Sequence, residues 1–256
     1  MKKNETLPKR LVALLLFSLL SLSMLGMFSL DATQTLHAMV YTCESKFAST
    51  LDTLRILAQT DQARRMNVDA FTPLLDRLQL TDAGTLYWMA YPDGTYFTSP
   101  QGKSPYNLSE RSYFPDLTRG YEVVGSLVVG YVSGRKSAVV AVPVWRNGQV
   151  VGALGASLFL EELSREVSGV FGFGENTLFF ALAPDGQTTL NWKAERIFRD
   201  PREQNDPSMA QAMDVLLSLP RGQVEYTFGG KTRTVFFQKG EYTGWSYGLG
   251  QWESGE

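Results

Sequence analysis

One arginine lies between aromatic residues in the loop-like stretch PYNLSERSYF. The cation is Arg111, and its aromatic neighbours are Tyr106, Tyr113 and Phe114. A guanidinium is a planar fork of donors that matches a carboxylate, and aromatic rings supply rigid walls and hydroxyls that orient a ligand. These residues therefore predict a carboxylate-binding site.

A purely structural role is the alternative for this arginine. Arg111 directly follows Glu110, and Asp116 comes shortly after it. An ion pair with either acid, or hydrogen bonds to backbone carbonyls, would fix the loop without any ligand. The residues alone leave both interpretations open.

Residues for catalysis or metal binding are scarce. The chain has a single His, His37, and a single Cys, Cys43. They lie in a helix-like stretch at a spacing that points them in different directions, so neither a metal site nor a Cys/His pair is expected. No Gly-rich phosphate loop, HExxH or GxSxG sequence occurs. We therefore expect a binding module without a cofactor or metal, and not an enzyme.

The loop of Arg111 lies among segments with the composition of strands. WMAYPDGTYFTS predicts a hairpin around Pro92-Asp93-Gly94, and FFALAPDGQTTL predicts a second one around Pro184-Asp185-Gly186. Between Leu86 and Leu158 we expect about five antiparallel strands, with SPQGKSPYNLSERSYFPDL as a loop. Three more strands follow the second hairpin, so the pattern predicts two related modules in tandem.

Several helices are expected to support these strands. Asp31 to about Met66 contains no Gly or Pro, and an apolar stripe runs along it at steps of three and four: Leu36, Val40, Cys43, Phe47, Leu51, Leu54 and Ala58. The stripe either packs against its own domain or forms a dimer seam. Shorter helices are expected over Asp69–Leu80 with Asp69 as N-cap, before a C-cap at Gly169, and from Asp206-Pro207 onward.

The N-terminal part has the composition of a membrane anchor. Residues 11–30 carry no charge, and a helix of that length spans roughly 30 Å, the thickness of a bilayer core. Lysine and arginine precede them, which predicts a cytoplasmic stub over 1–10 and an exported remainder. The run is longer than a signal h-region, so we expect a retained single-pass anchor. The net charge of −2 argues against nucleic acid as a ligand.

The order and spacing of several stretches resemble the double Cache (double PDC) family of extracytoplasmic sensor domains. The stretches are YPDGTYFTS, NLSERSYF, SAVVAVPVWRNGQVVGALGASL and GEYTGWSYGLG. The resemblance implies an α+β fold with an N-terminal transmembrane helix, a long helix and two tandem PAS-like antiparallel-sheet modules. It divides the chain into helices over 31–80, a membrane-distal first module over 81–168 and a membrane-proximal second module over 169–256.

The resemblance also assigns roles to individual residues. The family's ligand-binding Tyr, Arg, aromatic pair and later Tyr fall on Tyr106, Arg111, Tyr113, Phe114 and Tyr131. The Asp that holds the amine of an amino-acid ligand falls on Ser157, which is neutral and cannot pair with an ammonium group. The expected ligand is therefore a small organic acid and not an α-amino acid. Arg135 and Lys136 either add positive charge at the mouth of this site or form a solvated turn.

Members of this family commonly serve chemoreceptors, histidine kinases or diguanylate cyclases. This sequence shows no second span and no output domain, so we expect a sensor that signals through a partner protein or as a homodimer. The alternative is an interaction protein with a vestigial pocket that binds another receptor's exported domain. An open, polar pocket at Arg111 would favour the sensor, and a filled pocket would favour the alternative. The second module lacks a comparable clamp and is expected to support or relay.

Overall fold

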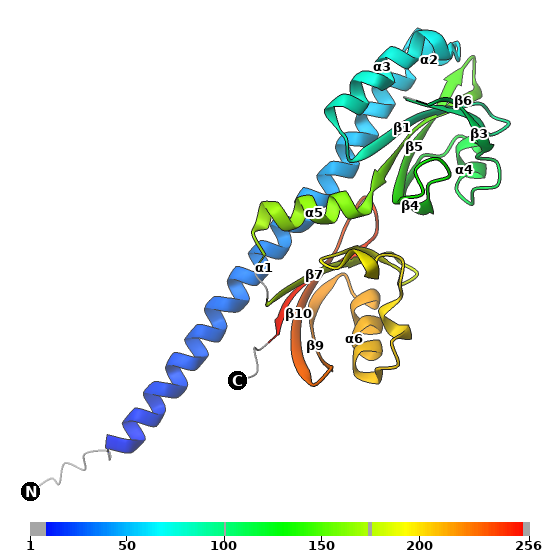
Figure 1. Ribbon diagram of the computed structural model, residues 1–256. Helices are drawn as coiled ribbons and strands as arrows, with labels where there is room; N and C mark the ends of the chain where they lie inside the picture. Colours follow the sequence, from blue (N-terminus) through cyan, green and yellow to red (C-terminus); the bar gives the residue numbers. More distant parts are fainter. Residues whose placement is uncertain (1–8, 100, 174–175, 253–256) are drawn as a thin grey trace, which may run out of the picture.

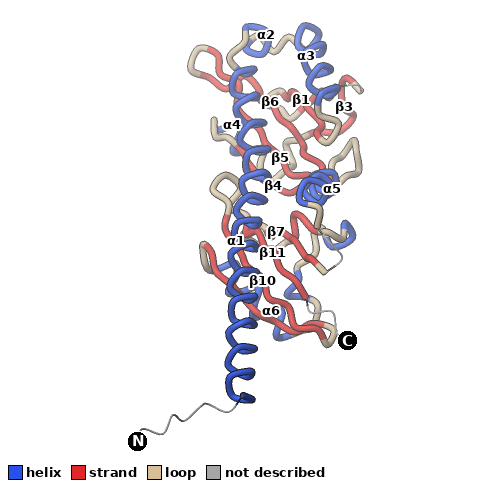
Figure 2. Tube along the Cα trace, turned by 90° about the vertical axis from the view of Figure 1, so that its left-hand side faces the viewer, coloured by secondary structure: helices blue, strands red, loops and turns tan. Residues whose placement is uncertain are grey.

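A long helix runs beside two sheets that lie one above the other (Figure 1). The computed structural model describes residues 9–99, 101–173 and 176–252, with side chains from residue 31 onward. This helix, α1, spans Lys9–Ala58, and Figure 2 shows it passing along both sheets. Most of the stub predicted over 1–10 lies outside the described residues.

No helix within the described residues carries an apolar stretch long enough to cross a membrane. The anchor predicted over 11–30 lies outside the part of the chain whose side chains are described, although its backbone belongs to α1. The anchor therefore stays a prediction.

The apolar stripe of α1 packs against the chain's own sheets. All its members are buried, with exposed fractions of 9% or less: Leu36, Val40, Cys43, Phe47, Leu51, Leu54 and Ala58. This agrees with the first of the two interpretations of the stripe. The helix ends at Ala58, short of the expected Met66, because Thr60 caps a separate helix, α2 (Asp61–Arg64). The Thr60 Oγ1 accepts the Ala63 N–H at 3.3 Å.

The next helix, α3 (Val68–Thr81), begins one residue earlier than expected. Its N-cap is Asn67, whose extended backbone places Oδ1 3.1 Å from the Ala70 N–H. The prediction of Asp69 as N-cap was wrong, because Asn67 satisfies the free N–H first and leaves Asp69 inside the first turn.

The first module is built on a six-stranded antiparallel sheet, one strand more than expected. Its strands are β1 (Thr85–Ala90), β2 (Thr95–Thr98), β3 (Gly102–Asn107), β4 (Val123–Val129), β5 (Lys136–Arg146) and β6 (Gln149–Phe159), in the order β3-β2-β1-β6-β5-β4. The extra strand is β3, which lies in the stretch expected to be a loop. As an edge strand it pairs on one side only, so it tolerates Pro105.

Two helices complete the first module. The short α4 (Phe114–Arg119) follows the loop of Arg111, and α5 (Leu160–Phe171) leaves the end of β6 and leads to the second sheet (Figure 1). The prediction that Gly169 ends α5 was wrong. The helix ends at Phe171, and its C-cap is Gly172, which has the left-handed conformation (φ 57°) that glycine adopts readily.

The second module has a five-stranded antiparallel sheet, as expected. Its strands are β7 (Thr177–Leu182), β8 (Thr188–Asn191), β9 (Arg221–Phe228), β10 (Lys231–Lys239) and β11 (Ser246–Trp252), in the order β8-β7-β11-β10-β9. The helix α6 (Pro207–Ser218) covers one face, and Asp206 caps it as predicted. Two short 3-10 helices, η1 (Ala194–Arg196) and η2 (Pro201–Glu203), lie between β8 and α6.

The two Pro-Asp-Gly sequences form equivalent hairpin turns. Gly94 and Gly186 both have positive φ, 84° and 96°. In each turn the Asp carboxylate accepts the N–H two residues on, at 2.9 Å from Asp93 and 3.0 Å from Asp185. The repeated hairpin and the two antiparallel sheets agree with two tandem PAS-like modules.

The modules touch each other directly. The Lys136 ammonium of β5 donates to the Ile197 carbonyl of the second module at 2.6 Å. Gly125 of β4 lies against Trp245 of the second module, where a Cβ would be 3.2 Å from the indole nitrogen. Trp245 in turn packs edge-on against Phe47 of α1, with ring centroids 5.0 Å apart. The first sheet, the second module and α1 therefore meet around Trp245.

Candidate functional site

A small cavity lies in the first module between the sheet and the loops that cover it. Its volume is about 30 Å³, which has room for roughly two water molecules. Four of the expected site residues line it: Arg111, Tyr113, Tyr131 and Ser157. The structure thus brings together side chains from the loop before α4, the turn after β4 and strand β6.

Arg111 is held by the turn that precedes α4. Its N–H donates to the Leu108 carbonyl at 2.9 Å, and its carbonyl accepts the Phe114 N–H at 3.0 Å. The guanidinium Nη2 donates to the Val129 carbonyl at 2.6 Å. The guanidinium carbon lies 3.5 Å from the centroid of the Tyr131 ring, a close cation–π contact.

No acidic residue in the described part of the chain pairs with Arg111. Its neighbour Asp116 forms an ion pair with Arg119 instead. The structural alternative of an ion pair is therefore not found among the described residues. The alternative of a backbone contact is present once, at the Val129 carbonyl. The Arg111 Nε is buried and has no hydrogen-bond partner in the described chain. Arg111 thus lines the cavity and carries a buried donor without a partner.

Tyr131 and Tyr106 form the outer edge of the site. Their rings stack at 5.2 Å with an interplanar angle of 18°. They are 36% and 50% exposed, so solvent reaches both rings. Phe114 lies elsewhere, because it begins α4 and turns into the core of the first module, where it is 3% exposed.

Two tyrosines on the inner side are neutral hydrogen-bonding groups. Burial raises the pKa of Tyr113 well above its usual range, and the nearby Arg111 charge opposes this only in part. Burial likewise raises the pKa of Tyr96, which also lines the cavity. Both phenols therefore keep their protons at neutral pH and can donate to an anion.

Ser157 stands where the family pattern has its amine-binding Asp, and its hydroxyl already contacts a tryptophan. The Ser157 Oγ accepts a hydrogen bond from the Trp88 indole N–H at 3.3 Å. The Trp88 ring lies over Gly155, where a Cβ would be 2.1 Å from a ring atom. Sequence reasoning missed Trp88 as a cavity residue. Its position in β1, opposite the glycine-containing β6, is the signal that could have indicated it.

The two cations near the mouth have other partners. Arg135 pairs with Glu162 at 2.8 Å and lies over the Phe159 ring. Lys136 donates to Ile197 across the module boundary. The turn is therefore not simply solvated, because it packs against α5 and the second module. Neither cation is part of the described lining of the cavity, and a contribution of charge at its mouth stays a prediction.

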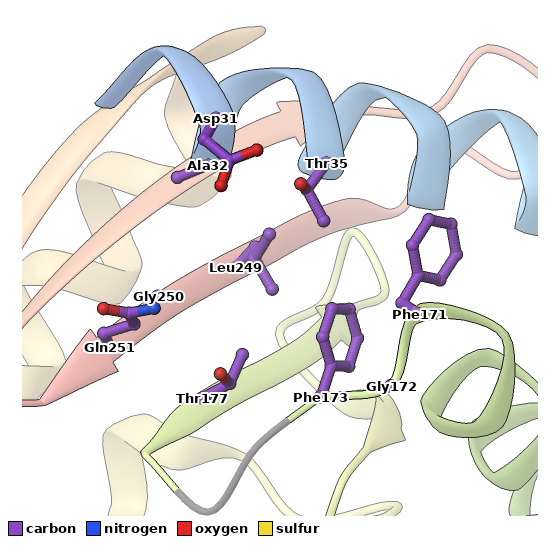
Figure 3. A pocket seen from close by; sticks show the side chains of 10 residues that line it. All are labelled: Asp31, Ala32, Thr35, Phe171, Gly172, Phe173, Thr177, Leu249, Gly250 and Gln251. Carbon is purple, nitrogen blue, oxygen red and sulfur yellow. The ribbon is translucent and has the colours of Figure 1, made fainter. Parts of the chain in front are cut away.

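A larger hollow lies beside the second sheet and has different chemistry. Its volume is about 180 Å³, and it is bounded by the part of α1 near Asp31, the end of α5 and strand β11 (Figure 3). Phe171 and Phe173 stack in its wall with ring centroids 5.6 Å apart. Asp31 is the one charged residue of its described lining. This hollow therefore does not suit a carboxylate.

Comparison with known proteins bears on the fold. No protein-family model and no curated protein matches the chain. Among solved structures, it is similar to the ligand-binding domain of the Pseudomonas aeruginosa PAO1 amino acid chemoreceptor PctB in complex with L-Arg. The identity is 19%, the TM-score is 0.69, and the match covers 87% of this chain and 94% of that one.

Two further solved structures have the same arrangement. The ligand-binding domain of the Pseudomonas fluorescens chemoreceptor CtaA with L-alanine matches at 18% identity and TM-score 0.69, over 87% of this chain and 96% of that one. The extracellular domain of a proposed histidine kinase, rpHK1S-Z16, matches at 16% identity and TM-score 0.72, over 90% and 96%. The chain therefore has the double Cache fold of chemoreceptor and histidine-kinase sensor domains, as the sequence resemblance predicted.

Proposed function

We propose that this protein is an extracytoplasmic sensor domain that binds a small carboxylate at Arg111 in its first module. The observation that carries the proposal is that the Arg111 guanidinium lacks a partner for one of its buried donors in the described chain. It lines a cavity, has no acidic partner among the described residues, and keeps a buried Nε–H without an acceptor. A buried donor left unpaired costs roughly 1–3 kcal/mol, so an acceptor in the cavity would be stabilising.

A carboxylate is the acceptor that suits this geometry best. One oxygen would accept the Arg111 Nε–H, and the second would accept a remaining Nη–H of the same fork. The protonated phenols of Tyr113 and Tyr96 would add neutral donors without adding charge. No Asp or Glu is among the described residues that line the cavity, so the site lacks a carboxylate to pair with an ammonium group.

The small volume of the cavity supports a second candidate function. At about 30 Å³ the cavity is nearly filled by its own side chains, which is what a vestigial pocket in an interaction protein would show. Under the sensor proposal, any acid larger than a few atoms needs the exposed rings of Tyr131 and Tyr106 to move outward. Those two rings are then a lid that closes over Arg111.

Thermal unfolding of the full chain separates these functions. Small carboxylic acids should raise the melting temperature of the native protein and of Arg119→Ala, an exposed arginine of the same module that serves as a control. They should not raise that of Arg111→Ala. A hundredfold excess over the dissociation constant adds about 2.7 kcal/mol of stability, which is easily measured.

The possible failures of this experiment have distinct meanings. If α-amino acids raise the melting temperature and carboxylic acids do not, the assigned ligand class is wrong. If neither class acts at any concentration, the interaction function is favoured.

The membrane and the partner belong to the same proposal. The uncharged run over 11–30 would anchor the chain in the cell membrane once, with the modules outside the cytoplasm. Because α1 continues from Lys9 to Ala58 without a break, the predicted anchor and the sheets share one helix. The signal would then pass along α1 to a partner protein. The protein should stay in the membrane pellet after alkaline extraction, and release into the supernatant would contradict a spanning anchor.

A further inference from the structure

The second module contains a cavity that corresponds to the one at Arg111. It lies between the sheet and the segment that carries η1, η2 and α6, and its volume is about 40 Å³. No acidic residue is part of its described lining, and Arg196 is the one charged residue there. The expectation that this module lacks an arginine clamp therefore needs to be revised.

Arg196 is half-buried and has no side-chain partner in the described chain. Its backbone is fixed in η1, where its N–H donates to the Lys193 carbonyl at 3.0 Å and its carbonyl accepts the Arg199 N–H at 3.0 Å. The nearby Arg202 differs, because it forms ion pairs with Asp200 and Asp214. Arg196 thus lines the cavity with a guanidinium whose donors no other described residue uses.

Neutral donors line the same cavity as this guanidinium. Asn191 is 8% exposed, and its Oδ1 accepts the Lys193 N–H at 2.9 Å, which leaves its Nδ2 without an acceptor among the described residues. Tyr226 is 7% exposed, and burial raises the pKa of its hydroxyl, which therefore stays protonated. Thr188 also lines the cavity, and no side-chain hydrogen bond occupies its hydroxyl in the described chain.

We infer that this cavity is a second binding site for a small carboxylate, with Arg196 as the cation and Asn191 and Tyr226 as neutral donors. The hydrocarbon part of the ligand would contact Phe180 and Met209, which complete the wall. A cavity of about 40 Å³ has room for roughly three water molecules, close to the size of acetate. The inference does not depend on the site at Arg111, because the residues of the two cavities do not overlap.

Sodium acetate is the probe that tests this site, titrated into the full chain with sodium chloride at equal ionic strength as the control. Binding is followed by the arginine Nε–H resonances in ¹⁵N spectra and by thermal unfolding. We expect Arg196→Ala to weaken acetate binding in the second module by about tenfold or more, since it removes charge-assisted hydrogen bonds. Arg199→Ala changes an exposed arginine in the same segment and should bind acetate like the native protein.

Combining variants separates this inference from the proposed function. If both sites bind, Arg111→Ala and Arg196→Ala each remove part of the acetate-induced stabilisation, and the double variant removes all of it. If Arg196→Ala binds acetate as the native protein does, the second site does not exist, whatever Arg111→Ala shows. If only Arg196→Ala reduces binding, this inference stands and the function proposed for Arg111 fails.

Two control measurements test whether the response to acetate is specific to this site. Tyr226→Phe keeps the ring and removes only the hydroxyl, so it should fold normally and weaken acetate binding by a smaller factor than Arg196→Ala. An equal response to sodium chloride and sodium acetate would mean general screening of charge, and it would overturn the inference.

Discussion

Glu44 is a buried carboxylate where α1 meets the loop between β10 and β11, and it offers a sharp test of how the helix is joined to the second module. It is 7% exposed. Its Oε2 accepts the N–H groups of Tyr242 at 2.7 Å and Thr243 at 3.3 Å. Its Oε1 accepts the hydroxyls of Thr243 at 2.7 Å and Tyr247 at 2.6 Å. Four donors from the second module therefore converge on one side chain of α1.

The change Glu44→Ala removes the acceptor for all of these donors at once. The Tyr247 hydroxyl is completely buried and Thr243 nearly so, and each buried group left without a partner costs roughly 1–3 kcal/mol. Relief of the carboxylate's own desolvation offsets part of the loss. We expect the free energy of unfolding to fall by about 3–4 kcal/mol. Glu44→Gln should lose less than Glu44→Ala, because its amide oxygen can still accept the Tyr242 and Thr243 N–H groups while its NH2 faces two hydroxyls that can also accept.

Urea unfolding at neutral pH, followed by tryptophan fluorescence, measures this loss. The matched control is Glu166→Ala, an exposed glutamate on α5, which should stay within about 0.5 kcal/mol of the native protein. A loss below about 1 kcal/mol for Glu44→Ala would show that water or a rearranged loop replaces the carboxylate. It would refute the conclusion that Glu44 holds the second module to α1.

Two further predictions concern a helix cap and the buried tyrosines. Asn67→Ala should destabilise the protein by about 1 kcal/mol in urea unfolding, whereas Asp69→Ala should cost less because Asn67 is the N-cap; the opposite order would restore Asp69 as the cap. In alkaline titration, the tyrosines with raised pKa should ionise only as the fold is lost: Tyr87, Tyr96, Tyr113, Tyr226 and Tyr247. Burial raises the pKa of Tyr87 to about 12, so its contribution to stability is complete below roughly pH 10, the ordinary tyrosine value, and disappears as pH rises through 12. Tyrosinate absorbance beside circular dichroism tests this, and ionisation of these five groups in a folded protein would contradict it.

Short-range patterns predicted the elements on which the site is built. The Pro-Asp-Gly turns form as expected because the Asp carboxylate needs only the N–H two residues on. The apolar stripe of α1 is buried because its spacing puts every member on one face of the helix. Arg111, Tyr113 and Tyr131 line one cavity, and their role in ligand binding stays a prediction.

Other features could not be predicted from local patterns. The strand β3 has the composition of a loop, and it is a strand because β2 offers it a pairing partner. Trp88 and Ser157 meet because β1 pairs with β6, although 69 positions separate them. Arg196 has no motif around it, and it lines a cavity only because β8, η1 and α6 close around the same space.

The sequence by itself determined the α+β class, the repeated hairpins and the presence of an arginine with aromatic neighbours, because each depends on residues a few positions apart. Only the tertiary structure decided which polar groups find partners. It paired Asp116 with Arg119 and left Arg111 and Arg196 without acids among the described residues. It also brought Tyr247 to Glu44 across 203 positions. Hydrogen bonds and charge pairs act over a few ångströms in space, so the packing of distant segments decides which of them form.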